Sequence, residues 1–286
     1  MSSNGYRAGG TRTPVPDDVV FDVRSITLRF GGVTSLNNVS LRMCRGEILA
    51  IIGPNGAGKT SLFNSLTGVY MPQEGTITLF EWPGAPGVEI CSMPIHKVNQ
   101  HGIARTFQNI RLFPKLTALE NVMVGVEARQ RSGPIAAMLG MPWQRREEHE
   151  STRRAHALLV RVGLDDRAND IASSLSYGEQ RRLEIARALG TNPRVLLLDE
   201  PAAGTNPAEK QELATLIRSI NNDGEVGVLL IEHDMKLIMS VADHVVVLNF
   251  GEKIAEGTSE QIQRDPAVIA AYLGSSATPN GATRGE

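Results

Sequence analysis

Short apolar runs alternate with segments of helical periodicity along most of the chain. A short apolar run bounded by turn residues is typical of a buried strand, and apolar positions three or four apart indicate a helix. Strands are predicted at residues 19–30, 39–43, 48–52, 76–80, 195–198, 226–231 and 244–249, and helices at 59–67, 178–189, 208–221, 235–241 and 259–273. This alternation predicts a mostly parallel sheet that is covered by helices on both faces.

The middle of the chain has a different pattern. From about Ala104 to Ser174, charged and apolar residues recur at helical spacing and strand signals are scarce. This texture predicts a helical subdomain inserted within the α/β body. Arginines and glutamates are interspersed over residues 145–154, which favours a solvated helix face over a binding patch.

Composition narrows the class of protein. The 286 residues carry a formal net charge of −2, so the chain lacks the excess of positive charge that is typical of nucleic-acid-binding proteins. The two cysteines, Cys44 and Cys91, exclude a disulfide scaffold and favour reduced thiols. No apolar run approaches the ~18 residues of a membrane span, and the first twenty residues lack the apolar centre of a secretory signal. We therefore expect a cytoplasmic protein, with peripheral attachment to a membrane complex still open.

A glycine-rich loop follows the apolar run 48–52 and precedes a predicted helix. It fits the phosphate-loop pattern G-x-x-x-x-G-K-[ST], and its residues are Gly53, Pro54, Asn55, Gly56, Ala57, Gly58, Lys59 and Thr60. Its backbone N–H groups and the helix N-terminus form a site for phosphate. We expect Lys59 to reach the β- and γ-phosphates and the Thr60 hydroxyl to bind Mg²⁺.

The run Val195–Leu198 ends in two carboxylates, Asp199 and Glu200. Ligands of α/β sheets bind at the carboxyl ends of the strands, so both acids are expected beside the phosphate loop. Asp199 suits the Mg²⁺ shell, and Glu200 suits a general base that orients the attacking water.

The segment Leu175–Gln180 begins a predicted helix, with Ser176 as N-cap and Glu179 completing a capping box. Its sequence, LSYGEQ, also resembles the signature of ATP-binding cassette (ABC) ATPases, and the acidic strand follows at the spacing that this family has. The resemblance implies a P-loop NTPase fold of the ABC type, with a mostly parallel sheet, an antiparallel β edge and an inserted helical subdomain. It further implies that ATP is sandwiched between the phosphate loop of one cassette and the signature of another.

The same resemblance assigns expected roles to further residues. Gln108 is similar to the family's Q-loop glutamine and would bind Mg²⁺, and His233 is similar to the switch histidine that holds the γ-phosphate. Phe30 lies where the family stacks an aromatic ring on adenine, with Val33 and Ser61 among the ATP contacts. Ser176, Tyr177, Gly178 and Glu179 would act in trans, so this chain needs a second cassette, either a related sister or itself.

Several stretches narrow the resemblance to ATPase subunits of bacterial branched-chain amino acid importers, the LivG type. They are residues 101–113, 176–187, 201–204, 206–207, 231–236 and 265–274, together with a helical insertion at 127–150. This implies two integral-membrane permeases, a periplasmic binding protein as an indirect partner, and a place on the cytoplasmic face of the inner membrane. The surface at 110–116 is a candidate permease groove, with packing inside the helical subdomain as the alternative.

The expected organisation is one ABC ATPase domain over residues 18–274. Residues 18–103 and 176–258 would form the α/β core, 104–175 the helical subdomain, 259–274 a C-terminal helix, and 1–17 and 275–286 disordered tails. Tyr177 stands in place of the family's usual second signature glycine, and Asn206 in place of its usual aspartate. Alternatives are another cargo (urea, short amides or lipopolysaccharide), a soluble ABC ATPase without a transport role, or a nucleotide-binding regulator.

Overall fold

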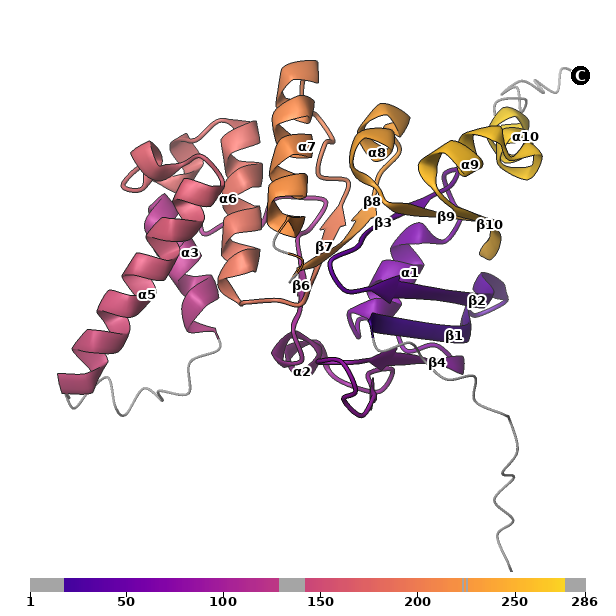
Figure 1. The fold of residues 1–286 in the computed structure, drawn as a ribbon, viewed down its shortest axis with the longest axis horizontal. Helices are drawn as coiled ribbons and strands as arrows, with labels where there is room; N and C mark the ends of the chain where they lie inside the picture. Colours follow the sequence, from indigo (N-terminus) through magenta and orange to yellow (C-terminus); the bar gives the residue numbers. More distant parts are fainter. Residues whose placement is uncertain (1–17, 129–141, 223, 225, 276–286) are drawn as a thin grey trace, which may run out of the picture.

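The computed structural model describes residues 18–128, 142–222, 224 and 226–275, and places two sheets beside a group of helices (Figure 1). The predicted tails therefore lie outside the described residues except for Ser275, as do residues 129–141 of the predicted insertion. A six-stranded sheet has the order β10-β9-β3-β8-β7-β6. Its strands are β3 (Ile48–Ile52), β6 (Ile103–Arg105), β7 (Val195–Asp199), β8 (Gly227–Ile231), β9 (His244–Asn249) and β10 (Glu252–Gly257).

The strands of this sheet are parallel except for β10, which pairs antiparallel with β9. All five residues of β3 are buried, which is expected for a central strand with helices or sheet on both faces. Leu49 packs in one apolar cluster with Phe63 of α1 (Lys59–Leu66), whereas Ala50 packs in another with Ile238 of α8 (Met235–Val241). Successive side chains of β3 therefore contact opposite layers. The predicted mostly parallel sheet is confirmed.

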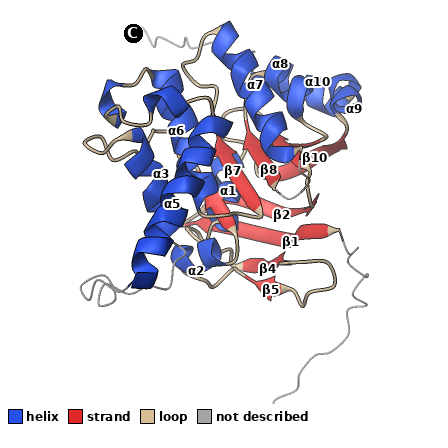
Figure 2. Cartoon of the chain, turned by 60° about the vertical axis from the view of Figure 1, so that its left-hand side comes forward, coloured by secondary structure: helices blue, strands red, loops and turns tan. Residues whose placement is uncertain are grey.

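A second, antiparallel sheet lies against one side of this core (Figure 2). Its strands, in the order β2-β1-β4-β5, are β1 (Val19–Phe30), β2 (Val33–Cys44), β4 (Glu74–Leu79) and β5 (Val88–Glu89). The sequence predicted only residues 39–43 of β2. The polar residues Asn37 and Asn38 interrupt the apolar pattern of this strand. They lie at an irregularity, because Asn38 has a left-handed backbone (φ 51°) and the pairing with β1 shifts register there.

The helical part consists of α3 (Ala118–Glu127), α5 (Pro142–Arg161), two short 3₁₀ turns (Asp165–Arg167 and Ala172–Ser174) and α6 (Tyr177–Gly190). Helices α3 and α6 approach very closely. A Cβ built at Gly125 would lie 2.1 Å from the carbonyl oxygen of Arg187, so only glycine fits there. The chain enters this part from β6 and leaves it for β7, and these two strands are neighbours in the sheet.

The remaining helices are α2 (Ile95–Gln100), α7 (Pro207–Asn221), α9 (Ser259–Arg264) and α10 (Pro266–Ser275). The prediction of a single helix at 259–273 is wrong. It divides into α9 and α10 because Pro266 cannot continue a helix and Asp265 before it has an extended backbone.

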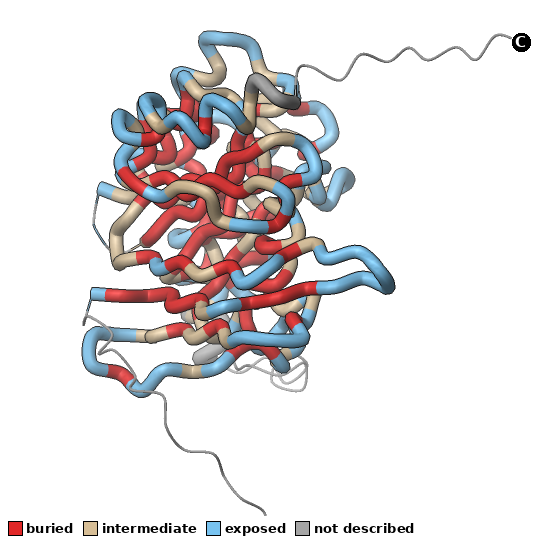
Figure 3. Tube along the Cα trace, turned by 90° about the vertical axis from the view of Figure 1, so that its right-hand side faces the viewer, coloured by how far each residue is buried: buried red, intermediate tan, exposed pale blue. Residues whose placement is uncertain are grey.

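Burial follows the layers of the fold. Figure 3 shows buried chain through the middle of the molecule and exposed chain along its outer turns. Strands β3, β7 and β8 run parallel through that middle, so their carboxyl ends meet at one edge of the sheet. The phosphate loop follows β3 and Glu200 follows β7 directly, and His233 lies two residues after β8, so all three lie at this edge.

Candidate nucleotide-binding site

The phosphate loop connects β3 to α1 and depends on glycine where the backbone turns. Gly58 is the N-cap of α1 with a left-handed backbone (φ 99°), and a Cβ built at Gly53 would lie 2.1 Å from the Leu248 carbonyl oxygen. Lys59 Nζ donates to the carbonyl oxygens of Gly53 (2.7 Å) and Pro54 (3.0 Å). The ammonium group is thus held over the loop, where it can compensate phosphate charge.

Lys59 is half-buried, and burial lowers the pKa of its ammonium group, while the negative charge of Glu200 acts in the opposite direction. Thr60, the second residue of α1, is exposed beside the loop, and the Ser61 hydroxyl lies 2.7 Å from the Ser35 hydroxyl of β2. Asn55 and Gly56 are exposed, and Ala57 is buried. The loop therefore presents its tip and the Thr60 hydroxyl outward.

The two acids after β7 have different surroundings. Asp199 is buried, and its Oδ2 accepts a hydrogen bond from Arg105 Nη2 at 2.8 Å. Glu200 is half-buried, and its left-handed backbone (φ 46°) is a strain that non-glycine residues keep mainly where the surrounding structure fixes it. Its amide donates to the Ile231 carbonyl at 3.0 Å, and Gln108 Nε2 donates to its Oε2 at 3.0 Å.

The expected switch histidine, His233, follows β8 with its side chain 68% exposed. The preceding residue, Glu232, is buried and accepts hydrogen bonds from the backbone N–H groups of Ala202 (2.8 Å) and His233 (3.1 Å). One carboxylate thereby holds the chain after Glu200 and the backbone of His233 together. The structure thus brings Lys59, Gln108, Glu200 and His233 to one edge of the sheet.

Phe30 and Val33 are paired at the β1–β2 turn, and both side chains are exposed. The Phe30 ring stands edge-on to Tyr70, with ring centroids 4.9 Å apart. An exposed aromatic ring held by a second ring offers one face to a planar ligand.

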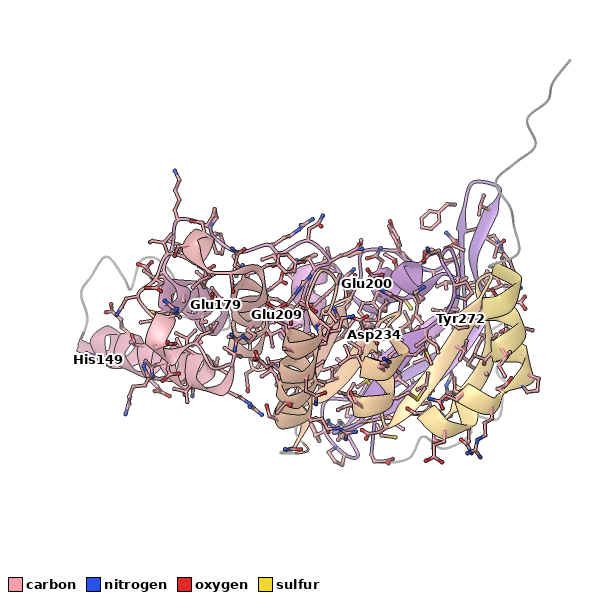
Figure 4. The ribbon with its side chains drawn as sticks, turned by 90° about the horizontal axis from the view of Figure 1, so that it is seen from above. His149, Glu179, Glu200, Glu209, Asp234 and Tyr272 are labelled. Atoms are coloured by element: carbon pink, nitrogen blue, oxygen red, sulfur yellow. The ribbon has the colours of Figure 1, made fainter. Side chains whose placement is uncertain are left out.

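The signature segment is far from the phosphate loop of the same chain. Ser176 accepts a hydrogen bond from the Glu179 amide at 3.3 Å, and Glu179 Oε2 accepts one from the Ser176 amide at 2.8 Å. The predicted capping box is confirmed. Figure 4 shows Glu179 on the helical part and Glu200 over the core, at separate places along the molecule. Ser176, Tyr177 and Gly178 therefore do not complete the site of their own chain.

The donor set fits a magnesium ion. Thr60, Gln108 and Asp199 offer hydroxyl, amide and carboxylate oxygens, the ligands that Mg²⁺ prefers. Among the described residues no group of three or more His, Cys, Asp or Glu side chains could hold a metal by itself. This suits an ion bound by a few protein oxygens together with phosphate and water.

An apolar cavity of about 880 Å³ lies beside the Gln108 loop and is lined mainly by the segment after α1, by α2 and by β6. Its lining includes Val69, Ile95, Arg105 and Phe107. None of its lining residues belongs to the predicted groove 110–116. In that segment Phe113 is half-exposed under the Arg187 guanidinium, and Leu112 packs against the helical core.

Sequence reasoning missed the residues that hold the site residues in place. Arg105 and Glu232 lie in the stretches 101–113 and 231–236 that carry the resemblance, but neither was assigned a role, because their contacts form only in the tertiary structure. The available signals were this resemblance and the position of each residue at the end of a strand, next to a candidate site residue.

Comparison with known families gives a match over most of the core. Residues 36–203 match the ABC transporter family, and residues 252–278 match the branched-chain amino acid ATP-binding cassette transporter family. The second match covers β10, α9 and α10.

Two relatives and two solved structures are similar over nearly their whole lengths. The high-affinity branched-chain amino acid transport ATP-binding proteins BraF of Pseudomonas aeruginosa and LivG of Salmonella typhimurium are each 48% identical, over 89% and 88% of this chain and 98% and 96% of their own. An ATP-binding cassette of an ABC transporter in its ADP conformation has a TM-score of 0.76 at 30% identity, covering 90% of this chain and 99% of its own. A dimeric bacterial ABC transporter cassette has a TM-score of 0.69 at 26% identity, covering 84% and 98%.

Proposed function

The chain belongs to the family of ABC transporter ATP-binding proteins, and we propose that it is the ATP-hydrolysing subunit of a branched-chain amino acid importer. The observation that carries the proposal is the meeting of Lys59, Gln108, Glu200 and His233 at one sheet edge, in a chain 48% identical to BraF and LivG. The C-terminal match at 252–278 favours branched-chain amino acids over the other cargoes.

In this proposal the core binds ATP and orients the attacking water. The loop amides and Lys59 bind phosphate, and Phe30, with Val33 beside it, contacts the adenine. Glu200 accepts the proton of the attacking water, Gln108 fixes the Glu200 carboxylate, and His233 donates to the γ-phosphate. Mg²⁺, held by Thr60, Asp199 and Gln108, would neutralise charge on the phosphate oxygens.

The second half of the site comes from another cassette. Ser176 and the amides at the N-terminus of α6 would contact the γ-phosphate bound by a partner's loop, because a helix N-terminus favours an anion. A dimeric cassette among the similar structures supports this arrangement. The partner is a related sister subunit or a second copy of this chain.

Permease subunits are the proposed membrane partners. Among the helices that the structure describes, none is long and apolar enough to cross a membrane. We place the chain on the cytoplasmic face of the inner membrane, peripherally, with a permease segment in the cavity lined by Val69, Ile95 and Phe107. A periplasmic binding protein would deliver the cargo without touching this subunit.

We propose one ABC domain over residues 18–274, with a helical subdomain that was predicted at 104–175. Helix α6, predicted as part of the α/β core, packs with α3 and α5 and is counted here with the helical part. The sheet of the domain includes β6 (Ile103–Arg105), so the helical excursion begins after Arg105. The tails 1–17 and 275–286 have no role in the proposal.

The test of the enzyme is a pair of variants in the full-length chain. Glu200→Gln keeps the shape of the side chain but cannot accept a proton, so ATP hydrolysis should fall by about 100- to 10,000-fold. ATP should still bind and should drive the variant into dimers on size-exclusion chromatography. Glu260→Gln, an exposed residue of α9, is the control. Wild-type turnover by Glu200→Gln would contradict the role of Glu200.

The test of the transporter is capture of the tagged chain from detergent-solubilised membranes. Two permeases and a second ATPase should be recovered, and Ile95→Asp should reduce permease recovery without changing ATP hydrolysis. Phe113→Asp tests the predicted groove 110–116 in the same way. Recovery of soluble proteins alone would contradict the transporter assignment and leave an ATPase.

A further inference from the structure

Helix α6 carries a buried ion pair that the catalytic proposal does not use. Arg181 and Glu184 lie one turn apart, with Nη1 of Arg181 2.9 Å from Oε2 of Glu184, and their side chains are 2% and 1% exposed. Burying two charges is costly unless further hydrogen bonds satisfy them. The partners of those further hydrogen bonds therefore indicate which part of the chain the ion pair keeps in place.

Both side chains of the pair bond to the backbone of the Gln108 loop. Arg181 donates from Nη1 to the Phe107 carbonyl at 2.6 Å and from Nη2 to the Gln108 carbonyl at 2.9 Å. Glu184 Oε1 accepts from the amides of Phe107 (3.4 Å) and Arg111 (3.2 Å). The loop backbone is thus held on both sides of Gln108 by one helix.

The guanidinium nitrogen of Arg181 that bonds to the Gln108 carbonyl also contacts the signature segment. This Nη2 lies 3.4 Å from the Tyr177 hydroxyl, and the guanidinium carbon is 5.9 Å from the centre of the Tyr177 ring. Tyr177 follows Ser176 directly. Arg181 therefore lies between the Gln108 loop and the exposed N-terminus of α6.

We infer that Arg181 and Glu184 are positioning residues that hold the backbone of the Gln108 loop and thereby fix the position of the Gln108 side chain. Gln108 contacts Glu200 in its own chain, whereas Ser176 faces the site of the partner cassette. The inference rests on the proposed function, because it needs Gln108 to act in ATP hydrolysis.

The pair's effect on Gln108 can be separated from its effect on folding by a double-mutant cycle in the full-length chain. Arg181→Lys keeps the positive charge but loses the planar guanidinium group, whose two nitrogens donate to the carbonyl oxygens of Phe107 and Gln108. We expect kcat for ATP hydrolysis to fall by about 10- to 100-fold, as when a group that orients a functional residue is lost, while KM for ATP stays unchanged. Glu184→Gln should lower kcat in the same direction.

The decisive variant combines Arg181→Lys with Gln108→Ala. If Arg181 acts through Gln108, the double variant should be no slower than Gln108→Ala alone, because the residue to be positioned is already gone. Multiplicative losses would overturn the inference, since they are what independent sites give. A Gln108→Ala variant with full activity would overturn it as well.

A matched control is Arg161→Lys. Arg161 also donates from one Nη2 to two backbone carbonyls, those of Ser219 (3.0 Å) and Ile220 (3.2 Å), but on α7 and away from the Gln108 loop. Its kcat should equal that of the wild type, and a loss as large as that of Arg181→Lys would overturn the inference.

Should the single variants fold poorly, Arg181→Met with Glu184→Leu removes both charges and can restore stability. Its melting temperature should recover while kcat stays low, and recovery of both would contradict a positioning role. If the wild-type chain, alone or with its partner subunits, hydrolyses no ATP, it is the proposed function that fails, which distinguishes the two outcomes.

Discussion

The phosphate loop lies in the core between a buried strand and a helix, whereas the signature segment begins a helix at the surface of the helical part. In the core, Gly53 is pressed against the Leu248 carbonyl, and the Lys59 ammonium group is held by two loop carbonyls. In the helical part, Ser176 is exposed and Glu179 is half-buried, and the two residues bond to each other in the capping box. One half of the site is fixed by the fold around it, and the other by a local cap.

This difference agrees with the proposal that one chain carries two halves of a site that only a second cassette can complete. We expect the core half to bind nucleotide by itself, because its donors and its strand ends are already in place. The signature half has a capped helix N-terminus but lies away from the phosphate loop of its own chain. Changes in the core should therefore affect ATP binding, and changes in the signature segment should affect only steps that need a second cassette.

Lys59→Ala should have the largest effect on function. Its loss removes the charged donor over the loop, so ATP affinity should fall by at least about 10- to 100-fold and hydrolysis should become undetectable. Titration with a fluorescent ATP analogue measures the affinity. Lys97→Ala, an exposed lysine of α2, should bind like the wild type. Tight binding by Lys59→Ala would show that the core half does not depend on this residue.

Arg105→Met should have the largest effect on stability. It leaves the Asp199 carboxylate buried without its partner at 2.8 Å, which should lower the free energy of unfolding by about 3–5 kcal/mol. Arg111→Met removes only a guanidinium stacked 4.4 Å from the centre of the Phe107 ring, which contributes about 1 kcal/mol or less. Urea denaturation compares the two. Equal losses would mean that the Asp199 pair does not support the core.

Ser176→Ala and Thr117→Ala form a matched pair, because α3 and α6 begin with the same capping box. Each should lower the free energy of unfolding by about 1 kcal/mol. Only Ser176→Ala should also reduce ATP hydrolysis, since only that helix N-terminus is proposed to face a partner's nucleotide. Steady-state ATP hydrolysis at matched protein concentration tests this. An equal loss of hydrolysis in both variants would show that Ser176 contributes only to folding.

The smallest expected effect is on thiol chemistry. Burial, reinforced by the charges of Glu47 and Asp18, raises the pKa of the Cys44 thiol to about 11. In a Cys91→Ser background, alkylation at pH 8 should be slow and should accelerate as the pH approaches 11, because the thiolate is the nucleophile. Unfolded thiols ionise near 8.5, so this group should reduce stability as the pH rises from about 8.5 to 11.

Cysteine labelling can also show whether the core and the helical part loosen independently of each other. Both cysteines lie in or beside the antiparallel sheet, and none lies in the helical part. Ser176→Ala and Thr117→Ala should therefore leave the labelling rate of Cys44 unchanged under native conditions. A faster rate in either variant would show that loosening the helical part also opens the core.

The sequence predicted the buried strands and the motifs at their ends well, because burial on both faces produces uninterrupted apolar runs. It missed β10, whose residues Glu252–Gly257 are largely polar on an edge strand, and it missed the short strand β6. Order and spacing were enough to predict that Lys59, Glu200 and His233 follow parallel strands. Their roles in hydrolysis remain predictions.

Pairs formed by tertiary contact could not be predicted. Arg105 and Asp199 are far apart in the sequence, and only the β6–β7 pairing brings them within 2.8 Å. The bonds from Arg181 to the Gln108 loop likewise depend on how α6 packs beside that loop. Arg181 and Glu184 are charged, so a periodicity argument would place them in solvent, yet both are buried.

The order of strands in the six-stranded sheet has a consequence for biosynthesis. Strand β3 is central, but both of its partners, β8 and β9, are made much later, starting at Gly227. At translation rates of 5–20 residues per second, roughly 9 to 35 seconds pass between the synthesis of the apolar β3 and that of β8, the first strand that pairs with it. Nascent chains that end before β8 therefore hold the phosphate-loop sequence without the sheet edge that supports it. ATP should bind only after synthesis is nearly complete, and shorter chains should need chaperones to protect β3.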